Sequence, residues 1–592
     1  MSGRHAALSI TALLFLLSLL LPLQLITDHH HHHHHHHHCE GNGNGDDIDN
    51  DGGSTLAITM SLLVRLTCLL ATLGQALPAA ATSTTPASFR DKCLAFRPES
   101  HISNSTRTRL EYIPAGTTLD LDDNVPSCHR PSQAVSVDLC RVALQIPTSY
   151  RSSISFELWM PEDWKHARYL ATGNGGVDGC IKYEDLAYGT SNGFATMGTN
   201  NGHNGTTGVD FLNNPDIIED FAYRALHTGT VSAKKLLKKF YARKVRKSYF
   251  IGCSLGGRMG VHAADKYPMD YDGIVAGAPA VDFNHLQGQR AMFYTITGAP
   301  DRADYIPIST WTGLIHDEVL RQCDGLDGVV DGIIEIPARC FFDPTTLLCE
   351  DGQYGGDCLN DAQVEQVQQI YAPYTYHNGR LIFPRNNPGN EIGAVQKLLA
   401  GAPFAYSVDW FRYVVLNDTT WQAEDYNRDL VRQADDLNPF NIRTYPRRLP
   451  KFKRRGGKMI SYHGGQDNQI TSFNTERWYD HMSAADRRLK DYFRTFRVSG
   501  MNHCSGGPGA WALGQGGGNP SRGVPFDGKH NALAAVVEWV EKGRAPTTLT
   551  GTKFVADNAD NGVDFQRDHC MYPKSQTYVG GNHKLRSSWK CR

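Results

Sequence analysis

Ser254 lies in a short motif that can make a serine nucleophilic. Residues 252–256 read Gly-Cys-Ser-Leu-Gly, which has the form Gly-x-Ser-x-Gly. Strand-forming residues (249–251) precede the motif, and a segment that can be helical (259–266) follows it. In a strand–turn–helix unit of this kind, the hydroxyl stands exposed at a helix N-terminus, whose N–H groups favour a developing anion. We therefore predict an active nucleophile; the alternative is a structural glycine turn.

A nucleophilic serine needs a base, and the base needs an acid to orient it. Residues 458–467 predict a short strand and a glycine-rich loop that carries Asp467. Residues 493–504 predict another strand, and the loop after it carries His503. A single Asp or His in a loop is often only a solvated surface residue. Both follow predicted strands, however, in the order Ser, Asp, His that α/β-hydrolases use. We predict that Ser254, His503 and Asp467 form a catalytic triad.

Two cysteines flank the predicted triad. Cys253 directly precedes the serine, and Cys504 directly follows the histidine. Together with the serine motif and the Asp and His loops, this pattern resembles the fungal tannase and feruloyl esterase family, in which a disulfide bond joins these two cysteines. The resemblance extends from about Phe89 to Arg592. It implies an α/β fold, an α/β-hydrolase core with a large inserted lid domain braced by disulfide bonds.

The order of predicted elements agrees with an inserted domain. The first part of the chain alternates between strand patterns, at 153–160, 169–172, 194–200 and 273–280, and a helical pattern at 221–240. The region that follows shows no strand–helix alternation. We predict a catalytic domain in two parts, 83–280 and 455–592, and a lid at 281–454. The lid is rich in aromatic residues, of which one or two are expected to receive an aromatic acyl group: Trp311, Phe404, Tyr406, Trp410, Phe411, Tyr413 and Trp421.

The N-terminal region contains two apolar runs, 8–26 and 56–77, separated by a histidine tract at 29–38. From Met60 the sequence has a basic residue, an apolar stretch and small residues, as in a secretory signal peptide. We predict that 60–82 is the signal peptide and that 1–59 is a low-complexity upstream extension produced by gene prediction. The alternative is a genuine extension, with 8–26 as signal or anchor.

Cysteine content and sequons also indicate secretion. Of 14 cysteines, Cys39 and Cys68 precede residue 83, which leaves an even number for disulfide bonds in an oxidising compartment. Asn-x-Ser/Thr sequons occur at Asn104, Asn204 and Asn417. The family resemblance implies six pairs: Cys93–Cys140, Cys128–Cys180, Cys253–Cys504, Cys323–Cys340, Cys349–Cys358 and Cys570–Cys591. We predict a secreted, extracellular protein.

Charge gives little indication of a macromolecular partner. The chain has 59 basic and 61 acidic residues, so nothing favours nucleic acid or another polyanion. We expect no stable membrane association, and the sequence leaves the oligomeric state open.

An acidic loop lies within the predicted lid. Residues 324–331 contain three aspartates separated by glycines, which supply the hard oxygen donors that Ca²⁺ prefers. The spacing is not that of an EF-hand. The resemblance implies a calcium loop, with carboxylates from Asp324, Asp327 and Asp331 and carbonyls from Val329 and Ile333. The alternative is an acidic turn held by a disulfide bond. We predict a structural calcium ion, because the loop lies in the lid and not beside Ser254.

The oxyanion of the reaction needs two N–H donors. The residue after the nucleophile, Leu255, supplies one in α/β-hydrolases, and a glycine loop after an early strand supplies the other. Residues 173–176 (Gly-Asn-Gly-Gly) follow the strand predicted at 169–172, so we assign the second donor to Gly175. The alternative for this loop is a flexible turn.

The family resemblance implies an esterase that acts on phenolic acid esters through an acyl-enzyme. The substrates would be feruloyl groups on plant cell-wall polysaccharide or galloyl groups in tannins, and we favour the feruloyl esters over the tannase alternative. A hypothesis of another class is a catalytically dead, secreted calcium-binding protein. The presence of both Ser254 and His503 counts against it.

Overall fold

The computed structural model describes residues 87–352 and 356–592. The predictions for the extension (1–59), its histidine tract and the signal peptide (60–82) lie outside the described residues. The described residues form one compact unit, and the division into catalytic and lid domains stays a prediction. Within the described residues, no helix has both the length and the apolar character to cross a bilayer.

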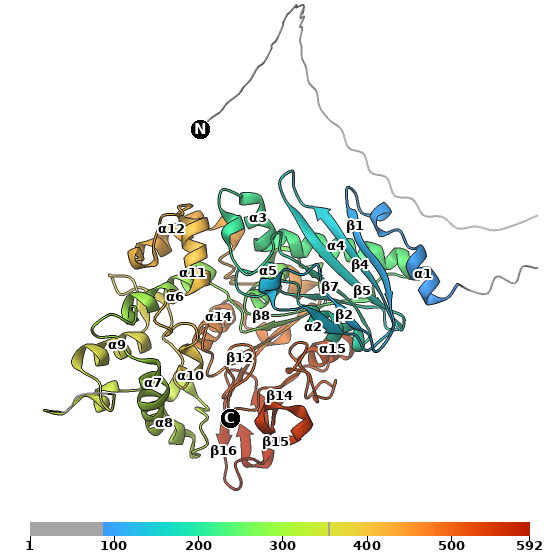
Figure 1. Ribbon diagram of the computed structural model, residues 1–592. Coiled ribbons are helices and arrows are strands. Elements are labelled where there is room, and N and C mark those ends of the chain that lie inside the picture. The colour runs from blue at the N-terminus through green and yellow to red at the C-terminus, as the bar shows by residue number, and fades with distance from the viewer. Residues whose placement is uncertain (1–86, 353–355) are drawn as a thin grey trace, which may run out of the picture. The chain divides into compact units, whose positions relative to one another are not determined.

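A nine-stranded sheet forms the centre of the fold (Figure 1). Its spatial order is β1-β4-β5-β7-β6-β8-β9-β12-β13. The bounds are β1 Thr106–Ile113, β4 Leu139–Pro147, β5 Ser153–Pro161, β6 Arg168–Thr172, β7 Phe194–Thr199, β8 Lys247–Cys253, β9 Gly273–Gly277, β12 Lys458–Gly464 and β13 Phe493–Val498.

The sheet has an antiparallel and a parallel part. Strands β1, β4, β5 and β7 pair antiparallel, whereas β7, β6, β8, β9, β12 and β13 pair parallel. Parallel strands are covered on both faces and read as continuous apolar runs. Strand β8 follows this rule, since its residues 248–252 are all buried. The strand that carries the nucleophile therefore lies in the interior of the sheet, between β6 and β9.

Helices cover both faces of the sheet. Alternate residues of β8 belong to different hydrophobic clusters: Phe250 packs with α4 and α5, whereas Tyr249 and Ile251 pack with α2 and α15. This division follows from the two-residue period of a strand. The covering helices are α2 Tyr183–Ser191, α4 Ala225–Phe240, α5 Leu255–Lys266, α14 Ser472–Ala485 and α15 Ala532–Lys542.

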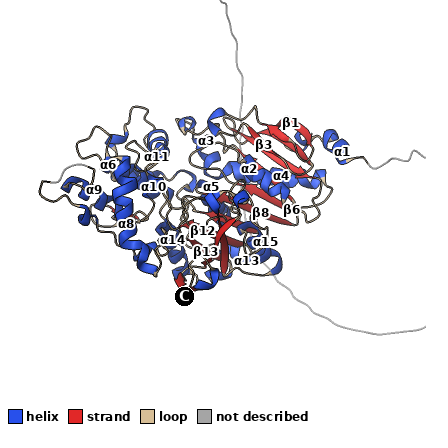
Figure 2. Ribbon diagram, turned by 60° about the horizontal axis from the view of Figure 1, so that its bottom comes forward, coloured by secondary structure: helices blue, strands red, loops and turns tan. Residues whose placement is uncertain are grey.

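A long insertion separates β9 from β12. It is largely helix and loop (Figure 2), with one two-stranded sheet, β10 Tyr374–Thr375 and β11 Leu381–Phe383. Phe283 and Trp410 pack edge to face inside it, with ring centroids 5.0 Å apart. Its helices are α6 Phe283–Thr297, α7 Ile308–Thr310, α8 His316–Cys323, α9 Asp361–Tyr371, α10 Glu391–Ala394, α11 Ala405–Trp410, α12 Asp429–Leu437 and α13 Pro450–Arg454.

Smaller helices and strands occur elsewhere in the described residues. They are α1 Phe89–Ala95, α3 Pro215–Glu219, and the pairs β2 Thr118–Asp120 with β3 Ser132–Ala134, β14 Thr548–Phe554 with β15 Val563–Cys570, and β16 Gln576–Tyr578 with β17 Trp589–Cys591. Six disulfide bonds brace the fold, and they join the six pairs that the family resemblance implies.

Candidate active site

Ser254 occupies a strained turn between β8 and α5. Its backbone has φ +63° and ψ −122°, a conformation that costs a non-glycine residue about 1–3 kcal/mol. The turn is tight: a Cβ on Gly252 would lie 2.8 Å from the carbonyl carbon of Gly256. The Ser254 N–H donates to the Gly277 carbonyl on the neighbouring strand, at 3.0 Å. These contacts hold the serine at the carboxyl end of the parallel strands, where α/β folds place their sites.

His503 and Asp467 form a hydrogen-bonded pair. The Nδ1 atom of His503 lies 2.8 Å from Oδ2 of Asp467. Oδ1 of Asp467 accepts the N–H groups of Gln469 and Ile470, each at 2.8 Å. Burial opposes ionisation of Asp467, but the charge of His503 and the hydrogen bonds from His503 and His463 bring the pKa below its usual range. The acid therefore stays a carboxylate, and His503 keeps its proton on Nδ1, with Nε2 as the base.

His463 is a residue of the site that the sequence analysis did not assign. Its Nε2 atom lies 3.1 Å from Oδ2 of Asp467 and 2.9 Å from the carbonyl of Ile470, so Nε2 carries a proton and donates to both. Its Nδ1 atom lies 2.7 Å from the hydroxyl of Thr475. The only signal in the sequence was its place at the end of a predicted strand, four residues before Asp467.

Ser254 and His503 line the same cavity, which has a volume of about 410 Å³. Asp467 is buried and is not part of the lining, so it lies behind the histidine, as the acid of a triad does. Of the lid aromatics, Tyr406 lines this cavity. The structure thus places the three predicted triad residues in one site: Asp467 bonds His503, and His503 shares the cavity with Ser254.

Of the predicted oxyanion donors, Gly175 lines the cavity and Leu255 directly follows Ser254. Leu255 begins helix α5, whose first N–H groups have no partner within the helix. Gly175 lines the cavity, but its N–H donates to Oδ1 of Asp178 at 3.3 Å. The amide of Asn174 fixes the loop by donating to the carbonyls of Cys180 and Thr199. The roles of Leu255 and Gly175 remain predictions.

Ionisable side chains line one wall of the cavity. Asp178, Lys182 and Asp185 belong to this wall. Burial raises the pKa of Asp178, and burial together with the charge of Glu184 raises the pKa of Asp185 to about 7. Shifted carboxyl groups in a cleft beside a nucleophile are candidates for contacts with a polar substrate group.

The Cys253–Cys504 disulfide bond belongs to the same cavity. Both cysteines line it, and their Cα atoms lie 6.0 Å apart across a sequence separation of 251 residues. The bond connects the residue before the nucleophile to the residue after the base. It therefore fixes the two loops whose relative position determines the geometry of the serine and the histidine.

We expect removal of this bond to affect catalysis more than stability. The loop-entropy relation assigns a loop of this length about 5–6 kcal/mol, and five other bonds already constrain the chain. A displacement of about 1 Å between Ser254 and His503 can lower the rate about a hundredfold. A Cys253→Ala/Cys504→Ala protein should therefore fold but show kcat/KM at least about tenfold lower.

The matched control is Cys570→Ala/Cys591→Ala, which removes a bond between β15 and β17. This protein should lose thermal stability and keep its kcat/KM. Measuring kcat/KM and Tm for both variants tests the assignment. Full activity combined with a large loss of Tm in the Cys253/Cys504 variant would show that this bond is only a structural brace.

The predicted calcium loop forms a compact acidic turn. Oδ1 and Oδ2 of Asp324 accept the N–H groups of Asp331 and Gly332. Oδ1 of Asp327 accepts the N–H of Val329 at 2.8 Å, whereas its Oδ2 is buried and has no hydrogen-bond partner among the described residues. Burial, together with the charges of Asp331 and Asp324, raises the pKa of Asp327 to about 6. This excess of carboxylate oxygen fits a hard cation by donor type.

An arginine from β15 offsets part of this charge. The guanidinium of Arg567 lies 3.5 Å from Oδ2 of Asp331 and donates to Glu335 at 3.0 Å. Within the described residues, no three His, Cys, Asp or Glu side chains are grouped closely enough to hold a metal ion by themselves. A cation in this loop would therefore need backbone carbonyls as well, as predicted for Val329 and Ile333.

The chain matches known proteins over nearly all of its described length. A probable feruloyl esterase B-2 from Aspergillus flavus is 52% identical over 501 residues, which cover 84% of this chain and 95% of that protein. A protein with the same description from Aspergillus terreus is 44% identical over 508 residues, 85% of this chain and 95% of that protein.

Solved structures agree with this relationship. The crystal structure of feruloyl esterase B from Aspergillus oryzae has a TM-score of 0.82 at 39% identity, over 85% of this chain and all of that one. Tannin acyl hydrolase from Aspergillus niger has a TM-score of 0.67 at 20% identity, over 86% of this chain and 96% of that one, which supports the fold alone. Residues 140–401 and 405–592 match the family described as tannase and feruloyl esterase. The chain therefore belongs to the tannase and feruloyl esterase family.

Proposed function

We propose that this protein is an extracellular feruloyl esterase that works through Ser254, His503 and Asp467. The observation that carries the proposal is the His503–Asp467 hydrogen bond at the cavity that Ser254 also lines. The relatives named feruloyl esterase B, at up to 52% identity, support the substrate class. The six disulfide bonds support an oxidising compartment, and secretion follows as part of the proposal.

In the proposed mechanism, Oγ of Ser254 attacks the ester carbonyl while Nε2 of His503 takes the hydroxyl proton. Asp467 holds the imidazole in the required tautomer and stabilises the imidazolium. The N–H of Leu255 stabilises the oxyanion, together with the N–H of Gly175 once it leaves Oδ1 of Asp178. His503 then protonates the leaving alcohol, and an acyl-serine remains. Water, activated by His503, hydrolyses this intermediate and releases the acid.

The two activities in this family, feruloyl esterase and tannase, differ in the acyl group of the ester. A feruloyl esterase accepts a methoxylated cinnamoyl group, whereas a tannase accepts a trihydroxybenzoyl group. We expect kcat/KM for methyl ferulate to exceed that for methyl gallate by at least about tenfold. A pocket that fits one acyl group discriminates by this order against another that differs in shape and polar groups. Polysaccharide-linked feruloyl esters are the natural substrates that we propose. A preference for methyl gallate would favour the tannase alternative.

The alternative of a catalytically dead binding protein has a direct test. A fluorophosphonate ester labels only a serine that a neighbouring base activates. We expect stoichiometric labelling, with the modified peptide containing Ser254. An unlabelled protein that still folds and binds calcium would favour the dead protein.

We also propose that the acidic loop holds a structural calcium ion. Asp324, Asp327 and Asp331 would supply carboxylates, with carbonyls from Val329 and Ile333. The ion would neutralise the charge of the buried Asp327 oxygen and would take no part in the reaction of Ser254. The support is the donor chemistry of the loop and the buried Oδ2 of Asp327, which has no partner within the described part of the chain.

Chelation is expected to lower the Tm and leave the catalytic groups in place. An ion at about 100 times its Kd stabilises the folded state by about 3 kcal/mol, and a chelator removes this contribution. The Asp327→Asn protein should show no response to chelator. In chelator alone it should be at least as stable as wild type, since repulsion from Asp324 and Asp331 is relieved. An unchanged wild-type melting curve after prolonged chelation would contradict the proposal.

A further inference from the structure

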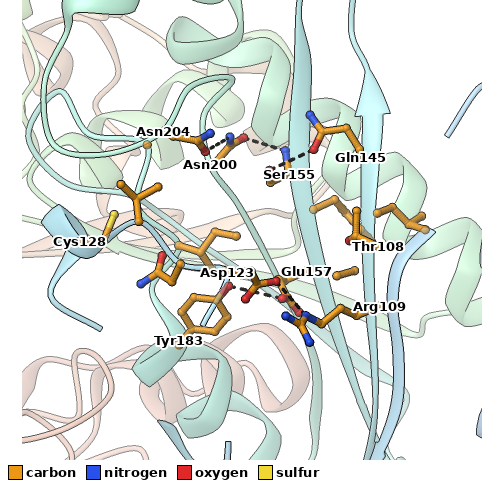
Figure 3. A pocket seen from close by; sticks show the side chains of 17 residues that line it. Thr108, Arg109, Asp123, Cys128, Gln145, Ser155, Glu157, Tyr183, Asn200 and Asn204 are labelled. Carbon is orange, nitrogen blue, oxygen red and sulfur yellow. Dashed lines mark hydrogen bonds and ion pairs between the residues drawn. The ribbon is translucent and has the colours of Figure 1, made fainter. Parts of the chain in front are cut away.

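A second cavity, of about 380 Å³, lies over β1, β4 and β5 (Figure 3). One segment forms a wall that it shares with the active-site cavity. Gly179, Ile181 and Tyr183 line the second cavity, whereas Asp178, Lys182 and Glu184 line the cavity of Ser254. Residues 179, 181 and 183 thus line one cavity, and residues 178, 182 and 184 line the other. A group bound in the second cavity would therefore contact segment 178–184 on the side opposite the active-site cavity.

The charges around the second cavity are paired. Glu157 at its base accepts hydrogen bonds from the buried Arg141, at 2.5 to 3.2 Å, and from Trp159 and Tyr183. At the rim, Arg109 pairs with Asp123 at 2.9 Å. A cation or an anion would have to compete with these contacts, so the cavity suits an uncharged occupant.

The remaining lining combines apolar and amide groups. Leu144, Phe156 and Ile181 give apolar surface, and Gln145 and Asn200 lie along one rim, as Figure 3 shows for the labelled amides. A pyranose ring has the same combination, with apolar C–H groups and peripheral hydroxyl groups. The volume lies at the low end of the range of about 300–1,000 Å³ that is typical of small-molecule sites. The lining therefore fits one or two sugar rings.

Asn204 places a sugar attachment atom at this rim. It is exposed, lines the cavity, and begins the sequon Asn204-Gly205-Thr206. Its Oδ1 accepts a hydrogen bond from Asn200 at 3.0 Å. Among the described residues, its Nδ2 has no protein partner, and Nδ2 is the atom that carries an N-linked glycan.

We propose that Asn204 carries an N-linked glycan whose first N-acetylglucosamine ring occupies this second cavity. The donor is a lipid-pyrophosphate oligosaccharide. The Nδ2–C1 bond forms, the bond between C1 and the pyrophosphate oxygen breaks, and the amide loses one proton. The ring then covers the apolar surface of Leu144 and Phe156 and presents its acetamide and hydroxyl groups to the amide rim.

The other sequons lack this arrangement. Nδ2 of Asn417 already donates to Asn213, at 2.6 Å, and neither Asn417 nor Asn104 lines the cavity. A glycan at Asn104 or Asn417 would extend into solvent. Asn204 is thus the sequon whose first sugar has a prepared site.

The first test compares glycan release in the folded and unfolded protein. The full chain is secreted from a glycosylating yeast and treated with peptide-N-glycosidase F, which converts each released asparagine to aspartate. We expect Asn204 to keep its glycan in the folded protein and to lose it after denaturation. In Gln145→Trp, whose indole fills the cavity, the Asn204 glycan should be released without denaturation. An unmodified Asn204, or equally fast release in folded wild type and Gln145→Trp, would overturn the proposal.

The second test measures stability. Thr206→Ala abolishes the sequon, whereas Thr206→Ser keeps it and serves as the matched control. We expect Thr206→Ala to lower the Tm by at least about 2 °C relative to Thr206→Ser. Equal Tm values would contradict a sugar packed in the cavity.

Discussion

Ser254→Ala is expected to abolish ester turnover. The substitution removes the only atom that forms the acyl-enzyme, and loss of a nucleophile typically lowers kcat by about 10⁴-fold or more. The fold should survive, because alanine is smaller than serine. The backbone φ of +63° at this position strains an alanine no more than it strains the serine. The measurement is kcat for methyl ferulate, together with the Tm.

Ser505 offers a matched control for this experiment. It lines the same cavity as Ser254 but lies outside the elbow motif. Ser505→Ala should therefore keep kcat within a few-fold of wild type. If Ser254→Ala retained more than about a hundredth of the wild-type kcat, another group would have to be the nucleophile.

Asp467→Asn should lower kcat by about 10³–10⁴-fold with little change in fold. In the wild type, Oδ1 accepts two backbone N–H groups and Oδ2 faces N–H donors of His503 and His463. An asparagine can keep its oxygen on the backbone side, but its NH₂ group then points at both imidazoles. His503 must accept with Nδ1 and carry its proton on Nε2, so it cannot take the proton of Ser254.

Kinetics and stability together test this argument. Asp435→Asn is a suitable control, because Asp435 accepts a hydrogen bond from another histidine, His285, and neither residue lines the cavity of Ser254. It should affect Tm and leave kcat nearly unchanged. An Asp467→Asn protein with more than about a tenth of wild-type kcat would show that the carboxylate does not set the tautomer of His503.

The elbow and both loops could be predicted from sequence, because local rules determine them. The glycines around Ser254 indicate a tight turn, and parallel strands give continuous apolar runs that end where the site residues lie. The predicted strands at 169–172 and 194–200 correspond to β6 Arg168–Thr172 and β7 Phe194–Thr199. A parallel sheet of this kind places its site residues at the carboxyl ends of the strands.

Strand β4 and the role of His463 could not be predicted in this way. Arg141 interrupts the apolar pattern of β4, and only the structure shows that Glu157 of β5 neutralises it in the interior. His463 bonds Asp467 through a turn that brings residues four apart into contact. Both features depend on pairing with a partner that no local pattern identifies. The second cavity likewise could not be predicted, because it depends on which residues of 178–184 line each of the two cavities.

The position of the insertion within the sheet has a consequence for biosynthesis. The 180 residues 278–457 separate β9 from its neighbour β12. At about 5–20 residues per second, a ribosome needs about 10–40 s to make them. During this time the outer edge of β9 has no partner strand and can pair with other chains.

The thiol of Cys253 also has to wait for Cys504, which is synthesised later still, while Cys323 and Cys340 emerge in between. We therefore expect newly made chains to need chaperones that shield that edge and disulfide isomerase that corrects early pairings, so the yield of active enzyme should follow their supply.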